Sequence, residues 1–186
     1  ESHKNELAGI YAMEFDPGTL EYYDQPPAIK LKYVAKNGKP VGVLHTPDFF
    51  VLRTTAAGWE EWKMESELVR LSHVMPNRYC LDAAGHWRCP PGETYAALFG
   101  LFYRLRSSAE VNWILQRNLR FLEDYLRDDC PPVETKTAQA ILRRIESQPG
   151  LTFLEVLEQT KAVSRDALYS LIATGQVYVD LARVAL

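Results

Sequence analysis

Three charged residues in the first third of the chain have types and a spacing suited to phosphodiester chemistry. Asp48 follows Pro47, and Glu61 and Lys63 come 13 and 15 residues after Asp48. Because side chains alternate between the two faces of a strand, Glu61 and Lys63 share a face if this segment is extended. Carboxylate oxygens are the ligands that Mg²⁺ takes, and a lysine can orient or deprotonate an attacking water or neutralise charge on phosphate.

A hairpin is expected to bring these three residues together. The Asn37-Gly38 dipeptide is a strong hairpin signal between extended segments over 28–34 and 40–54, the second of which contains Asp48. A further turn at 56–58 leads into a strand over 59–64. Pairing across this turn should place Glu61 and Lys63 level with Asp48. A helix is expected next over residues 65–74.

A third carboxylate is expected to approach from an N-terminal helix. The sequence predicts a helix over residues 1–14, ended by an Asp-Pro-Gly turn at 16–18. On this helix Glu6 falls between Ile10 and Met13, so its carboxylate points into an apolar side. A buried carboxylate is costly without a partner, which makes Glu6 a candidate for the same site.

The remaining elements predict two domains, one over residues 1–130 and one over residues 134–186. The first is completed by a helix over 93–99, a strand over 101–106 and a helix over 111–126, and a Pro-containing linker follows. The second contains three short helices and a final strand, expected at 138–146, 153–159, 165–174 and 176–181.

The composition is that of a globular protein. Hydrophobic residues make up 47% of the 186 residues, charged residues make up 24%, and the net charge of −3 excludes a wholesale basic coat for nucleic acid. No apolar run approaches 18 residues, so no membrane span is expected. Three cysteines without C-x-x-C spacing predict a reducing, intracellular setting. A local excess of arginine supplies candidate DNA contacts: Arg104, Arg106, Arg117 and Arg120.

The PD…ExK pattern, on a helix–hairpin–strand–helix layout, resembles the PD-(D/E)XK restriction-endonuclease-like superfamily. Within it the chain is most similar to the TnsA-like endonuclease subunits of heteromeric transposases. The family-like stretches cover nearly the whole chain and lie at Asn5-Glu6-Leu7 and at residues 13–17, 23–27, 46–49, 119–122, 168–172 and 175–181.

This resemblance implies an α/β restriction-endonuclease-like core followed by a C-terminal winged-helix-like α-rich domain. It also implies metal ligands at Glu6, Asp48 and Glu61, a catalytic lysine at Lys63, and two Mg²⁺ ions for which Mn²⁺ can substitute. The family's best-known member carries glutamine at the position of Glu61, whereas the wider superfamily uses Asp or Glu.

The expected activity is that of a metal-dependent DNA endonuclease that cleaves the 5′ ends of a transposon in the bacterial cytoplasm. The resemblance implies a TnsB-like DDE transposase as partner, either as a separate subunit or fused to this chain in a longer protein. Residues 134–186 carry six basic and six acidic side chains, so this module is expected to dock a TnsC-like ATPase regulator rather than bind duplex tightly. The alternatives are another restriction or repair nuclease of the superfamily, and a non-catalytic DNA-binding or assembly module.

Overall fold

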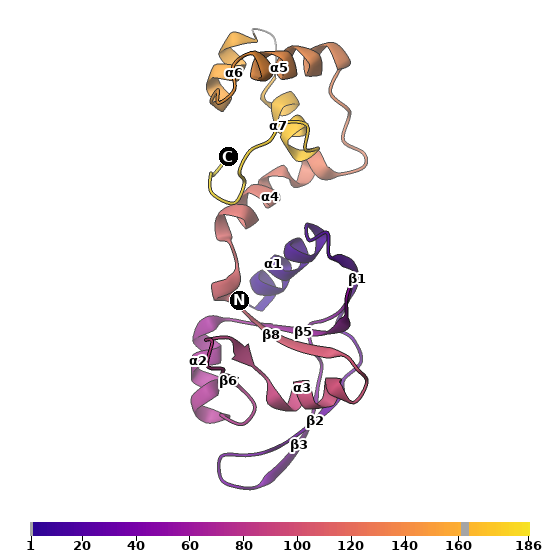
Figure 1. The fold of residues 1–186 in the computed structure, drawn as a ribbon, viewed down its shortest axis with the longest axis vertical. Helices are drawn as coiled ribbons and strands as arrows, with labels where there is room; N and C mark the ends of the chain where they lie inside the picture. The colour runs from indigo at the N-terminus through magenta and orange to yellow at the C-terminus, as the bar shows by residue number, and fades with distance from the viewer. Residues whose placement is uncertain (1, 161–163) are drawn as a thin grey trace. The chain divides into compact units, whose positions relative to one another are not determined.

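The structure is a computed structural model that describes residues 2–160 and 164–186 (Figure 1). Its contacts divide the chain into two units, one up to Val111 and one from Asn112. The first is a mixed α/β unit, and the described part of the second is helical. The boundary expected near residues 130–134 falls within the second unit, because helix α4 (Trp113–Leu126) packs against α7 (Arg165–Ala173).

A four-stranded mixed sheet forms the centre of the first unit, in the order β1-β4-β5-β8. The first three strands pair antiparallel, whereas β5 and β8 are parallel. The bounds are β1 (Thr19–Asp24), β4 (Phe49–Arg53), β5 (Ala57–Lys63) and β8 (Phe102–Ser107). The first unit also contains two antiparallel two-stranded sheets. One pairs β2 (Ile29–Val34) with β3 (Pro40–His45), and the other pairs β6 (Cys80–Leu81) with β7 (Trp87–Arg88). Strand β5 is therefore an interior strand of the main sheet.

The expected hairpin forms, but its second strand is shorter than the sequence predicts. Strands β2 and β3 are joined through Asn37-Gly38, where Gly38 has a φ of 81°. The extended segment expected over 40–54 is instead two strands in different sheets, because β3 ends at His45 and β4 begins at Phe49. Pro47 lacks the N–H that a continuous strand pair would need, so the ladder breaks there. Asp48 consequently lies immediately before β4.

Helices cover both faces of the main sheet. Helix α1 (Ser2–Glu14) packs on β5, and the core on that side contains Met13, Phe49, Val51 and Trp62. The opposite face is covered by α2 (Glu65–Val74) and α3 (Pro90–Ala97), and a short 3₁₀ turn, η1 (Ser108–Glu110), follows β8. The expected helix over 65–74 is confirmed, and residue 1 of the expected first helix lies outside the described residues. No helix in the described ranges is long and apolar enough to cross a bilayer.

The second unit is built from α4, α5 (Thr135–Ser147), α6 (Phe153–Gln159) and α7. The strand expected over 176–181 is wrong: no strand is present among the described residues of this unit, so an extended segment has no partner there. The segment instead bonds its first two amides, those of Gln176 and Val177, to the carbonyl of Leu171. The core of the unit consists of Leu122, Ile141, Val156, Leu168, Leu171 and Ile172.

Candidate active site

Asp48, Glu61 and Lys63 come together where β4 begins and β5 ends. Antiparallel pairing of these strands sets Asp48 beside Trp62, whose backbone N–H donates to Asp48 Oδ2 at 2.5 Å. Glu61 and Lys63 share one face of β5, and Lys63 Nζ is 3.1 Å from Glu61 Oε1. Strand alternation thus correctly predicts the pairing of Glu61 with Lys63.

The carboxylate of Glu61 is enclosed by aromatic side chains that come from distant parts of the sequence. Glu61 is only 1% exposed. The hydroxyl of Tyr79 donates to Oε1 at 3.0 Å, and the hydroxyl of Tyr103 donates to Oε2 at 2.6 Å. His45 Nε2 lies 3.4 Å from the same Oε2. We call His45, Tyr79 and Tyr103 the Glu61 cage. The sequence contained no signal for its two tyrosines, because buried tyrosines look like ordinary core residues.

The electrostatics of the pair keep both Glu61 and Lys63 charged. Burial acts to raise the pKa of Glu61, but the hydrogen bond of His45 and the ammonium of Lys63 outweigh it and hold that pKa at about 2. Burial likewise acts to lower the pKa of Lys63, but the charge of Glu61 and its hydrogen bond raise it above the ordinary value. A lysine with a raised pKa is protonated near neutral pH, so Lys63 is arranged to donate hydrogen bonds rather than to deprotonate a water.

Asp48 has the opposite tendency, toward the protonated state. Burial raises the pKa of Asp48 to about 6, and the charges of Glu61 and Glu6 act in the same direction against the N–H of Trp62 and the ammonium of Lys63. Glu6 is half-buried on α1, so its charge acts on Asp48 although it does not line the pocket described next. The other two predicted ligands therefore both act on Asp48, and a bound cation would relieve this repulsion.

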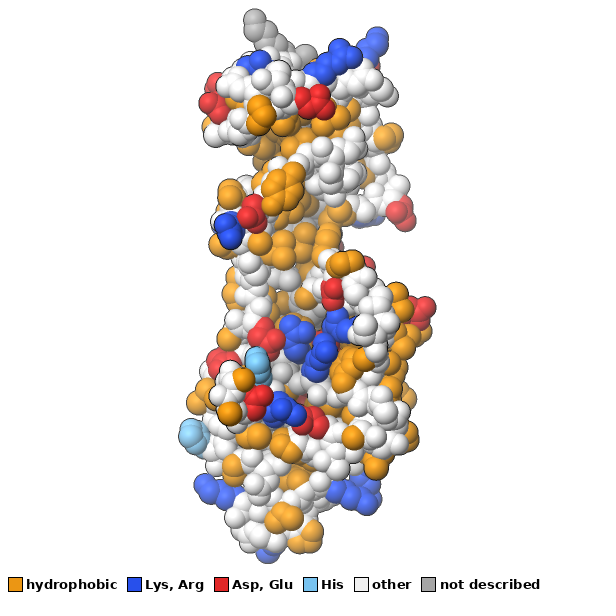
Figure 2. Space-filling model, viewed as in Figure 1, with side chains coloured by type: hydrophobic (Ala, Val, Ile, Leu, Met, Phe, Trp, Pro, Cys, Tyr) orange, Lys and Arg blue, Asp and Glu red, His pale blue; other side chains and the backbone are white. Residues whose placement is uncertain are grey.

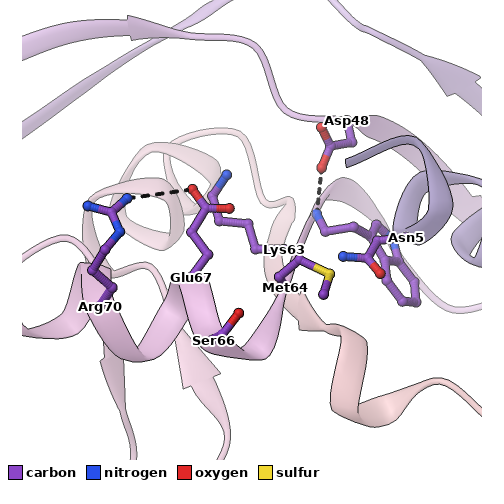
Figure 3. Close-up of a pocket in the computed structure, with 8 residues that line it drawn as sticks. Asn5, Asp48, Lys63, Met64, Ser66, Glu67 and Arg70 are labelled. Atoms are coloured by element: carbon purple, nitrogen blue, oxygen red, sulfur yellow. Dashed lines mark hydrogen bonds and ion pairs between the residues drawn. The ribbon is translucent and has the colours of Figure 1, made fainter. Parts of the chain in front are cut away.

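A pocket of about 440 Å³ opens beside Asp48 and Lys63 (Figure 3). It extends along the N-terminal turn of α2, where Glu67 and Arg70 form an ion pair at 4.0 Å. Its lining combines carboxylates with an ammonium and a guanidinium: Asn5, Asp48, Trp62, Lys63, Met64, Ser66, Glu67 and Arg70. Such a lining offers ligands to a cation and hydrogen bonds to a phosphate in one cavity.

The oxygen atoms of this pocket suit Mg²⁺, which keeps part of its water shell, better than a metal ion whose ligands all come from the protein. Among the residues that the structure describes, no three acidic, histidine or cysteine side chains lie close enough to hold a metal ion by themselves. Mg²⁺ usually takes one or two carboxylates and completes its shell with water and substrate phosphate, so a site based on Asp48 suits it. Ligation by Glu6 and Glu61 remains a prediction, and Glu61 would then share its oxygens with Lys63 and the cage.

The predicted DNA-contact arginines divide between the two units. Glu60 is fully buried and lies near three guanidinium groups, with Arg53 at 2.7 Å, Arg106 at 3.7 Å and Arg104 at 3.9 Å. Arg104 and Arg106 therefore offset a buried carboxylate. Separately, several Lys and Arg side chains gather on one face of the first unit (Figure 2). The other two predicted contacts are exposed on α4 of the second unit: Arg117 and Arg120.

Comparison with known proteins supplies no family assignment. No protein-family model matches the chain, and no curated protein sequence matches it.

Proposed function

We propose that this protein is a Mg²⁺-dependent DNA endonuclease of the PD-(D/E)XK kind. The observation that carries the proposal is the meeting of Asp48, Glu61 and Lys63 at adjoining ends of β4 and β5, beside a pocket lined by groups of both charges. Hydrolysis of a phosphodiester needs an oxygen-ligated cation near the phosphate and a fixed positive charge for the transition state. Asp48 is suited to the first requirement and Lys63 to the second.

Each side chain has a distinct role in this proposal. Asp48 holds the cation and is itself oriented by the N–H of Trp62. Glu61 fixes Lys63 through the contact at 3.1 Å, and the cage fixes Glu61 in turn. Lys63 then donates a hydrogen bond to a non-bridging phosphate oxygen as negative charge develops there. A bound Mg²⁺ would supply Lewis acidity and a water of lowered pKa.

A narrower proposal concerns the reaction in which the nuclease takes part. The family-like stretches support cleavage of the 5′ ends of a transposon, with a TnsB-like DDE transposase making the other cuts and a TnsC-like ATPase as regulator. The α/β unit followed by a helical unit is compatible with the nuclease and winged-helix-like order of that family, although the expected final strand is missing.

Nicking of supercoiled plasmid by the full chain tests the proposal. We expect cleavage in Mg²⁺ or Mn²⁺, none in EDTA, and none by Asp48→Ala. Lys63→Ala should retain Mg²⁺ binding by calorimetry but lose at least about 100-fold in rate, since its contribution belongs to the transition state.

Lys32→Ala serves as the control, because it removes an exposed ammonium from β2 without touching the pocket. It should nick like the wild type. Cleavage in EDTA, equal cleavage by Asp48→Ala, or no cleavage by the wild type under any of these conditions would overturn the proposal and favour a non-catalytic DNA-binding module.

A further inference from the structure

Asn5 is a buried amide without a partner in the described structure. It lies on α1 and is 1% exposed. Among the described residues neither its Oδ1 nor its Nδ2 has a hydrogen-bond partner. Asn5 nevertheless lines the pocket that contains Asp48 and Lys63, and Figure 3 shows it beneath Asp48, beside Met64. Asn5 therefore combines a buried amide, unpaired among the described residues, with a place in the wall of the candidate site.

A buried amide in this condition is expected to have a ligand. Buried polar groups are almost always hydrogen-bonded, because an unpaired one costs the full loss of its hydration. Gly9, one helical turn after Asn5, holds this face of α1 against the sheet: a Cβ there would lie 2.9 Å from two atoms of the Trp62 indole. The close packing of α1 on Trp62 thus keeps Asn5 at the pocket.

We infer that the side-chain oxygen of Asn5 is a further ligand of the divalent cation that Asp48 holds. The inference rests on the proposed function, which supplies the cation. Amide oxygens are hard, neutral donors of the kind that divalent cations of this class accept. Among the described residues no three acidic side chains gather into a metal site. The amide oxygen of Asn5, in the same pocket as Asp48, would therefore fill a coordination position of the cation that no carboxylate fills.

A cation suits Asn5 better than a phosphate does. Asn5 lies at the end of the pocket occupied by Asp48, and the next residue on α1 is Glu6, whose charge acts on Asp48. The carboxylate of Asp48 at this end of the pocket disfavours an anion there. The groups that attract phosphate, Lys63 and Arg70, are placed farther along the pocket, toward α2.

Calorimetric titration of the full chain with Mg²⁺ alone, without DNA, tests the inference. Loss of even an indirect metal partner commonly weakens binding 10–100-fold, so Asn5→Leu should weaken Mg²⁺ binding at least about tenfold. Asn5→Asp keeps an oxygen at this position and should bind Mg²⁺ at least as tightly as the wild type. Urea unfolding in EDTA should show Asn5→Leu to be as stable as the wild type or more stable, because it removes an unpartnered amide.

Asn77→Leu is the matched control, since Asn77 is exposed and donates to the carbonyl of Val34. It should leave Mg²⁺ affinity unchanged. If Asn5→Leu binds Mg²⁺ like the wild type while Asp48→Ala does not, the inference is overturned and the proposed function stands. If Asp48→Ala also binds Mg²⁺ normally, both the inference and the proposed function are overturned. Unchanged Mg²⁺ affinity with weaker duplex binding in EDTA would assign the amide to a phosphate and likewise overturn the inference.

Discussion

Replacing Asp48 with asparagine should stabilise the metal-free protein at about pH 8 and abolish its response to Mg²⁺. Burial raises the pKa of Asp48 from 3.8 to about 6, so the folded state binds a proton that the unfolded state has already lost between these values. The stability linked to this group is therefore present below about pH 4 and lost as the pH rises through about 6. At 1.36 kcal/mol per pKa unit the undiscounted penalty is about 3 kcal/mol, and solvent screening at this partly exposed carboxyl lowers it to about 1–2 kcal/mol. Asparagine removes this penalty and keeps an oxygen acceptor for the N–H of Trp62.

Urea unfolding followed by tryptophan fluorescence measures the effect, since three of the four tryptophans, Trp59, Trp62 and Trp87, lie in the first unit. The gain of Asp48→Asn should shrink toward zero near pH 4, and added Mg²⁺ should stabilise only the wild type. Asp82→Asn is the control of opposite sign, because the N–H of His86 lowers the pKa of Asp82. A destabilised Asp48→Asn, or a gain that does not change with pH, would refute the reasoning.

Two further predictions concern the packing that positions the site. Tyr103→Phe removes one hydrogen-bond donor from the buried carboxylate of Glu61 and should lower the free energy of unfolding in urea by roughly 2–3 kcal/mol. The control Tyr125→Phe removes a hydrogen bond to an exposed carboxylate and should lower it by less than about 1 kcal/mol. Equal losses in the two variants would show that the hydrogen bond to Glu61 has no special weight. Gly9→Ala should lower the free energy of unfolding in urea by about 1–2 kcal/mol, because the clash of the added Cβ with Trp62 exceeds the helix-propensity gain of alanine. A stabilised variant would show that α1 can shift away from Trp62 without cost.

Local sequence patterns determined much of the framework around the site. The Asn37-Gly38 turn and the helix over 65–74 are formed as predicted, because they depend on contacts between near neighbours in sequence. Strand alternation likewise placed Glu61 and Lys63 on one face of β5. The sequence also contained the reason for the break at Pro47, since proline cannot continue a strand ladder. The continuous extended segment predicted over 40–54 was wrong at this residue.

Contacts between distant segments decided the rest. Parallel pairing of β5 with β8 brings Tyr103 onto Glu61, across 42 positions of sequence, and no local pattern encodes that choice of neighbour. Docking of α1 on Trp62 selects the buried face of the helix, and it buries Asn5 more completely than the predicted Glu6. The segment over 176–181 has the composition of a strand but lacks a partner in its own unit. A strand exists only when another strand completes its hydrogen bonds, and that condition belongs to the tertiary structure.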